Sequence, residues 1–92
     1  MYDNYTRFYK MIDRFPRVSR LWDKQKHDLR VEAFEDELCV MSSSEVFIAK
    51  FFAAVWFWSS DKYEFDIVDS WSNIDSETRQ IVQDWLAAPF YP

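Results

Sequence analysis

The sequence predicts a single all-α domain, residues 1–92, built as a compact bundle of four to five helices around an apolar central helix at 43–58. Three observations lead to this fold class. Apolar residues recur at intervals of three and four along most of the chain, which is the spacing of one helical face. Ser42 and Glu45 form a capping box directly before an apolar run in which Lys50 is the only polar residue. The chain also contains no glycine, which the tight turns of an all-β fold require.

The first half of the chain is expected to hold three helices. The spacing of its aromatic and aliphatic residues predicts a helix at 3–14. Pro16 suits the first turn of a new helix, so a second helix is predicted at 17–26. Residues 23–28 contain no apolar side chain and form the connector, or a frayed helix end, before a third helix at 29–39.

An α+β fold is the alternative to the all-α bundle. Leu29, Val31 and Ala33 alternate with polar residues for three steps, as the residues of a strand would. One or two short strands near 29–41 and 63–68 would satisfy this alternation.

The second half is expected to continue from the central helix into two further elements. After a polar break, apolar residues suggest a short helix at 64–71. Asp75 is a good N-cap for a final helix at 76–88, and Pro89 ends that helix. The apolar residues 89–92 either pack across the bundle or are presented to a partner.

Missing residue types exclude most catalytic and cofactor chemistry. Without glycine, the chain lacks the phosphate-binding loops of nucleotide-binding proteins and the nucleophile elbow of α/β-hydrolases. Cys39 and His27 are the only residues of their kinds, so neither an internal disulfide nor a Cys/His zinc site can form within the chain. We expect His27 to be a surface residue and Cys39 to be buried and inert. The chain is therefore expected to be no enzyme and to hold no cofactor and no metal.

The apolar segments are too short for a membrane span. The longest apolar run, residues 51–58, is far below the roughly 18–20 residues that cross a bilayer. The N-terminus lacks the pattern of a secretion signal. We expect a cytoplasmic protein that does not contact a membrane.

Charge is distributed unevenly along the chain. Residues 1–30 hold eight Lys or Arg against four Asp or Glu, whereas residues 31–92 hold three against twelve. The candidate basic face consists of Arg7, Lys10, Arg14, Arg17 and Arg20, which could lie along a nucleic acid. The candidate acidic face consists of Glu32, Glu35, Asp36 and Glu37, which could meet a basic protein. An ordinary solvated surface is the simpler interpretation of both faces.

Aromatic residues are unusually frequent, at 21% of the chain. A core of 92 residues has difficulty enclosing five Trp, five Tyr and nine Phe, so some of these rings should be exposed, where they are typical of interfaces. The candidate partner-binding residues are Trp56, Trp58, Trp71, Phe90 and Tyr91, with core packing as the alternative for each.

The leading hypothesis is a small acidic, non-enzymatic protein-interaction module. It would bind a protein partner, as an inhibitor or regulator, or associate with itself as a homo-oligomer. The alternative is a nucleic-acid-associated protein that uses its basic N-terminal helix. In size and lack of glycine the chain resembles, in general style, the small accessory proteins of phages, plasmids and other mobile elements.

Overall fold

The computed structural model describes residues 3–59, 61–65 and 67–92, which are mostly helical. The chain divides into two compact units, Met1–Met41 with Pro92, and Ser42–Tyr91. The described residues also contain one two-stranded antiparallel sheet. The prediction of helices is therefore confirmed, and the small sheet agrees with the α+β alternative. The bundle arrangement and the single domain stay predictions.

The first unit begins with α1, Asn4–Ile12, close to the helix predicted at 3–14. Asp3 caps it, because its carboxylate accepts a hydrogen bond from the backbone N–H of Thr6 at 2.7 Å. Phe8 and Ile12 are fully buried, as their spacing predicts.

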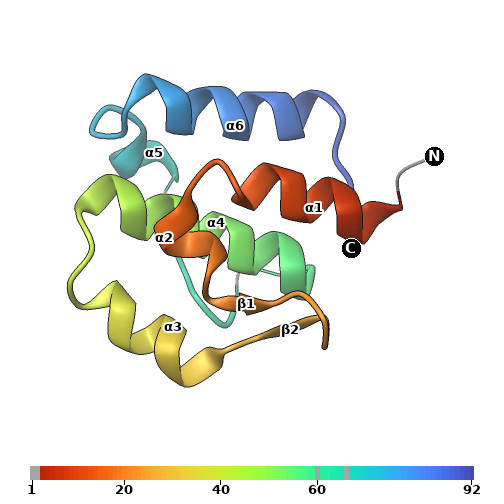
Figure 1. The fold of residues 1–92 in the computed structure, drawn as a ribbon. Helices are drawn as coiled ribbons and strands as arrows, with labels where there is room; N and C mark the ends of the chain where they lie inside the picture. The colour runs from red at the N-terminus through yellow and green to blue at the C-terminus, as the bar shows by residue number, and fades with distance from the viewer. Residues whose placement is uncertain (1–2, 60, 66) are drawn as a thin grey trace. The chain divides into compact units, whose positions relative to one another are not determined.

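The helix predicted at 17–26 is wrong beyond its first turn. Helix α2 spans only Pro16–Ser19, after which β1, Trp22–Asp23, pairs antiparallel with β2, Asp28–Leu29. Figure 1 shows this hairpin in the orange part of the chain.

The hairpin turn is made without glycine. The carboxylate of Asp23 accepts hydrogen bonds from the backbone N–H groups of Gln25 and Lys26, each at 3.1 Å. His27 then takes the left-handed conformation, with φ of 51°. The hydrogen bonds to Asp23 and the left-handed residue His27 together reverse the chain direction, in a polar segment whose sequence shows neither helix nor strand periodicity.

Helix α3, Val31–Leu38, follows the hairpin and lies inside the helix predicted at 29–39. The strands expected near 29–41 and 63–68 are therefore misplaced, since β1 and β2 lie earlier in the chain and only Leu29 falls in either range. The core of this unit includes an aromatic cluster. The Trp22 ring meets Phe8 edge-on at 5.5 Å and Phe34 at 6.0 Å between centroids.

The second unit begins with the apolar helix α4, Ser43–Phe57, within the predicted range of 43–58. Both hydrogen bonds of the predicted capping box are present, from Glu45 N to Ser42 Oγ at 3.2 Å and from Ser42 N to Glu45 Oε1 at 3.1 Å. Trp58 follows as the C-cap with φ of 61°, the left-handed position that glycine usually takes.

Two helices complete the second unit. Helix α5, Ile67–Trp71, is shorter than the helix predicted at 64–71, since residues 64–65 are not helical and residue 66 lies outside the described part of the chain. Helix α6, Ser76–Ala87, matches its prediction and is capped by Asp75. A hydrogen bond from Trp85 Nε1 to the carbonyl of Phe90, at 2.9 Å, folds the C-terminal tail back onto α6.

Candidate binding pocket in the second unit

An apolar pocket of about 390 Å³ lies within the second unit. Helices α4 and α6 supply most of its walls, and the loop after α4, the start of α5 and the C-terminal tail supply the rest. The lining residues are Phe51, Ala54, Val55, Trp58, Ser59, Phe65, Ile67, Val82, Trp85, Leu86 and Tyr91.

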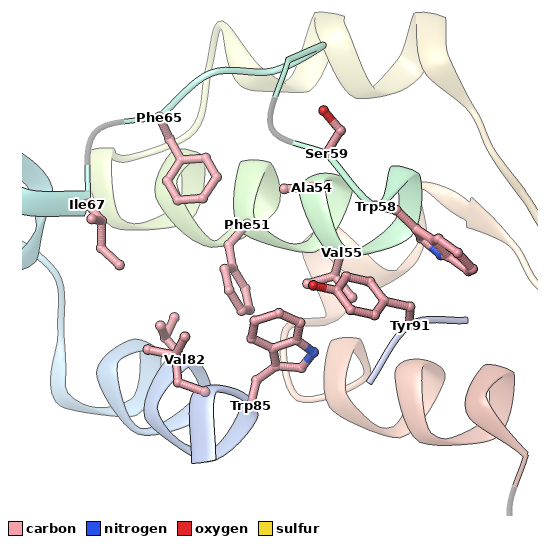
Figure 2. A pocket seen from close by; sticks show the side chains of 11 residues that line it. Phe51, Ala54, Val55, Trp58, Ser59, Phe65, Ile67, Val82, Trp85 and Tyr91 are labelled. Carbon is pink, nitrogen blue, oxygen red and sulfur yellow. The ribbon is translucent and has the colours of Figure 1, made fainter. Parts of the chain in front are cut away.

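The floor of the pocket is formed by aromatic rings from α4 and α6 that meet edge to face. Phe51 and Trp85 lie 5.5 Å apart between ring centroids, at an angle of 87°. Phe65 packs edge-on against Phe51 at 6.4 Å. Figure 2 shows Phe51 and Trp85 pointing toward one another, with Phe65 and Ile67 on one side. Because these rings hold each other through several contacts, the pocket is a preformed feature of the unit.

The other end of the pocket is closed by Trp58 and Tyr91 (Figure 2). Their ring centroids lie 5.6 Å apart, and Tyr91 also meets Trp85 edge-on at 5.6 Å. Tyr91 comes from the C-terminal tail, which the hydrogen bond between Trp85 and Phe90 holds in place. The tail thus contributes one wall of the pocket through Tyr91, and which of the two roles expected for residues 89–92 applies stays a prediction.

The pocket is open to solvent, because several of its apolar walls are themselves exposed. The exposed fraction is 67% for Trp58, 54% for Leu86 and 42% for Tyr91. Exposed apolar surface gathered around a concave site is typical of protein-interaction sites.

Of the five aromatic residues predicted to bind a partner, the structure brings Trp58 and Tyr91 together in the pocket. Trp56 and Trp71 are half-buried and do not line it. The Trp71 carbonyl accepts a hydrogen bond from Arg79 Nε at 3.1 Å. Phe90 does not line the pocket, and its backbone carbonyl accepts the hydrogen bond from Trp85. Whether any of these residues contacts a partner stays a prediction.

Sequence reasoning did not single out the other pocket walls, chiefly Phe51, Phe65, Trp85 and Leu86. Their spacing assigned them to the core, and α4 is apolar on nearly every side, so periodicity cannot show which side stays open. Adjacency gave no signal either, since the neighbours Ile81 and Val82 of the same helix are both buried.

In the first unit, the predicted basic and acidic faces meet one another. Glu37 accepts from Arg17 Nε at 3.3 Å and pairs with Arg20 Nη2 at 3.2 Å. Arg17 also donates to the carbonyl of Val40 at 3.4 Å. Arg17, Arg20 and Glu37, which the sequence suggested as contacts for an external partner, therefore pair with one another inside this unit. The other members of the two faces are exposed: Arg7, Lys10, Arg14, Glu32, Glu35 and Asp36.

The only histidine is exposed, as expected, but it is more ordered than its polar surroundings suggest. Its Nδ1 shares a hydrogen bond with the hydroxyl of Tyr9 at 2.8 Å, and its ring stacks on Tyr5 at 4.0 Å. Burial, followed by the nearby Tyr5, raises the pKa of Tyr9. His27 therefore fastens the hairpin turn to α1.

The expectation that Cys39 is buried is wrong. Cys39 is the C-cap of the short helix α3 and is exposed, with its Sγ donating to the carbonyl of Glu35 at 3.6 Å. Its neighbours Leu38 and Val40 are half-buried and exposed, respectively, so the apolar segment around Cys39 is not part of the core.

Local hydrogen bonds lower the pKa of Asp75 and Asp13, as they do for Asp3 at the start of α1. The backbone N–H of Thr78, followed by its hydroxyl, lowers the pKa of Asp75, to which Ser44 Oγ also donates at 3.4 Å. Burial alone would raise the pKa of Asp13, but hydrogen bonds from Lys24 and Ser19 hold it below its usual value. Asp75 thereby joins the first turn of α4 to the first turn of α6, the two helices that wall the pocket.

The described residues include no group of three or more His, Cys, Asp or Glu side chains that could hold a metal ion. Across residues 3–59, 61–65 and 67–92, no helix combines the length and the apolar character needed to span a membrane. No protein-family model, curated protein or solved structure matches this chain.

Proposed function

We propose that the chain is a non-enzymatic protein-interaction module that binds its partner through the pocket of the second unit. The observation that carries this proposal is the open, preformed apolar pocket whose exposed walls include Trp58, Leu86 and Tyr91. Aromatic anchors around a concave apolar site are typical of the residues that dominate protein–protein binding energy.

The open mouth favours a protein over a small molecule as the occupant. Pockets that hold small ligands bury most of the ligand surface and fix its orientation with several polar groups. Here the polar side-chain groups among the lining residues are the hydroxyls of Ser59 and Tyr91 and the indole N–H groups of Trp58 and Trp85. The N–H of Trp85 already donates to the carbonyl of Phe90. A partner side chain could fill the hollow while the surrounding partner surface rests on the exposed rim. By covering part of its partner, such a module would act as an inhibitor or regulator.

The test is selection of peptides from a random displayed library against the whole chain, followed by titration calorimetry with three proteins. Leu86→Asp places a charge on an exposed pocket wall and should weaken peptide binding at least tenfold, because burying a leucine side chain contributes about 1.5–3 kcal/mol. Val68→Asp is the matched control, since Val68 is 80% exposed in the same unit but does not line the pocket. It should change affinity less than twofold.

Three outcomes would contradict this proposal. One is the absence of any selected peptide. Another is equal binding by the wild type and the Leu86→Asp variant. The third is an equal loss in the two variants.

A further inference from the structure

We propose, resting on the function proposed above, that the occupant of the pocket is a basic amphipathic segment of a partner protein, with bulky apolar side chains flanked by Lys or Arg. The first supporting observation is how the net charge divides between the units. Residues 1–41 hold eight Lys or Arg and eight Asp or Glu, whereas residues 42–91 hold three against eight. The whole net charge of −5 therefore belongs to the unit that contains the pocket.

The second observation concerns two of these carboxylates, which lie in the loop that connects two lining residues of the pocket. Asp61 and Glu64 are both exposed and lie between Ser59 and Phe65, which are lining residues. The backbone N–H of Asp61 donates to Ser59 Oγ at 3.1 Å, which ties Asp61 directly to the pocket wall.

The lysine of the same segment is directed to rings that do not line the pocket. Lys62 Nζ lies 5.6 Å from the ring centroid of Phe57 and 5.8 Å from that of Tyr63. With Asp61 and Glu64 against Lys62, the loop that connects the lining residues Ser59 and Phe65 carries a net negative charge.

The negative charge of the second unit favours some possible occupants of its apolar pocket over others. Two copies of the chain that met through their pockets would bring two units of charge −5 together. Nucleic acids and anionic lipid surfaces would be repelled in the same way. A cationic segment is attracted, and exposed charges of opposite sign speed association and exclude wrong partners. The pocket supplies the apolar contact, and the rim selects the sign of the flanking charges.

The experiment uses three synthetic helical peptides with the same leucines at positions i, i+3, i+4 and i+7, flanked by lysine, glutamine or glutamate. Each is titrated into the whole chain at 50 and about 200 mM NaCl, where screening shortens the reach of exposed charges. At 50 mM salt we expect the lysine peptide to bind at least tenfold more tightly than the glutamate peptide. That ratio should shrink at the higher salt concentration.

Two variants connect the preference to the proposed site. The double variant Asp61→Asn and Glu64→Gln should reduce the lysine preference at least threefold and leave the glutamine peptide unchanged. Leu86→Asp should weaken all three peptides. As the matched control, Asp84→Asn removes an exposed carboxylate of α6 that is hydrogen-bonded to Gln80, and it should leave the lysine preference intact.

The outcomes separate the two proposals. Equal affinity for all three peptides, lost in Leu86→Asp, would overturn the basic partner and leave the interaction pocket standing. Failure of every peptide to bind would overturn both. Lysine-peptide binding that survives Leu86→Asp would show charge attraction outside the pocket and overturn this inference. Self-association of the chain that Leu86→Asp abolishes would replace the basic partner with a second copy.

Discussion

Replacing Asp75 with alanine should destabilise the chain by about 1–1.5 kcal/mol. Loss of an Asp N-cap costs about 0.5–2 kcal/mol, typically near 1. The Asp75 carboxylate accepts from Thr78 N at 2.8 Å and also receives the longer hydrogen bond from Ser44, which adds at most about 0.5 kcal/mol. A change of this size should lower the melting temperature by roughly 4–12 °C, because each kcal/mol shifts it by about 4–8 °C in domains of this length.

The pH dependence of this loss follows from the lowered pKa of Asp75. The folded-state pKa lies below the unfolded value of about 3.9, so the carboxylate stabilises the folded state above that pH. The contribution is lost as the pH falls through the folded-state pKa. The free-energy difference between wild type and Asp75→Ala should therefore be full at neutral pH and shrink below about pH 4.

Urea unfolding of wild type, Asp75→Ala and Asp75→Asn between pH 3 and 7 tests this reasoning. Asparagine caps helices about as well as aspartate, so Asp75→Asn should recover most of the stability and lose most of the pH dependence. Asp84→Ala, an exposed position on the same helix, is the control and should change stability by less than about 0.5 kcal/mol. A pH-independent loss in Asp75→Ala, or a loss no larger than that of the control, would refute the capping argument.

Four further substitutions test other parts of the fold. Phe52→Ala should cost about 3–5 kcal/mol in urea unfolding because Phe52 is fully buried, and Trp56→Ala should cost less because Trp56 is half-buried; equal losses would contradict the assignment of α4 positions. Tyr9→Phe removes the hydrogen bond to His27 and should cost about 0.5–1.5 kcal/mol, with faster hydrogen exchange in the hairpin; unchanged exchange would show that the bond does not hold the turn. Glu37→Gln should cost less than about 1 kcal/mol, because both arginine partners are substantially exposed, and the loss should disappear in high salt; a salt-independent loss would point to packing instead.

Helices with a strong local signal could be predicted from the sequence. The capping box at Ser42 and the N-cap at Asp75 begin α4 and α6 where the residue types place them. These signals act within four residues and depend little on the rest of the chain. The hairpin could not be predicted in the same way, because each of its strands has only two residues and its turn uses His27 where a glycine would be expected.

The candidate site was predictable only in part. An excess of aromatic residues predicts that some rings are exposed, and Trp58 and Tyr91 are both exposed and in contact. The pocket between α4 and α6 depends on the packing geometry of edge-to-face rings such as Phe51 and Trp85. Neither composition nor periodicity predicts that geometry. The predicted acidic face included Glu37, but its pairing with Arg17 and Arg20 was missed because these arginines lie distant in sequence.

The left-handed backbone at Trp58 has a consequence for engineering. A residue with a Cβ in this conformation is less stable than glycine by roughly 1 kcal/mol, and the exposed indole recovers little of that through burial. A laboratory screen for heat resistance alone should therefore replace this tryptophan early, whereas a screen for affinity should retain it. Sequencing the survivors of the two screens at position 58 would show directly whether the ring serves the fold or the partner.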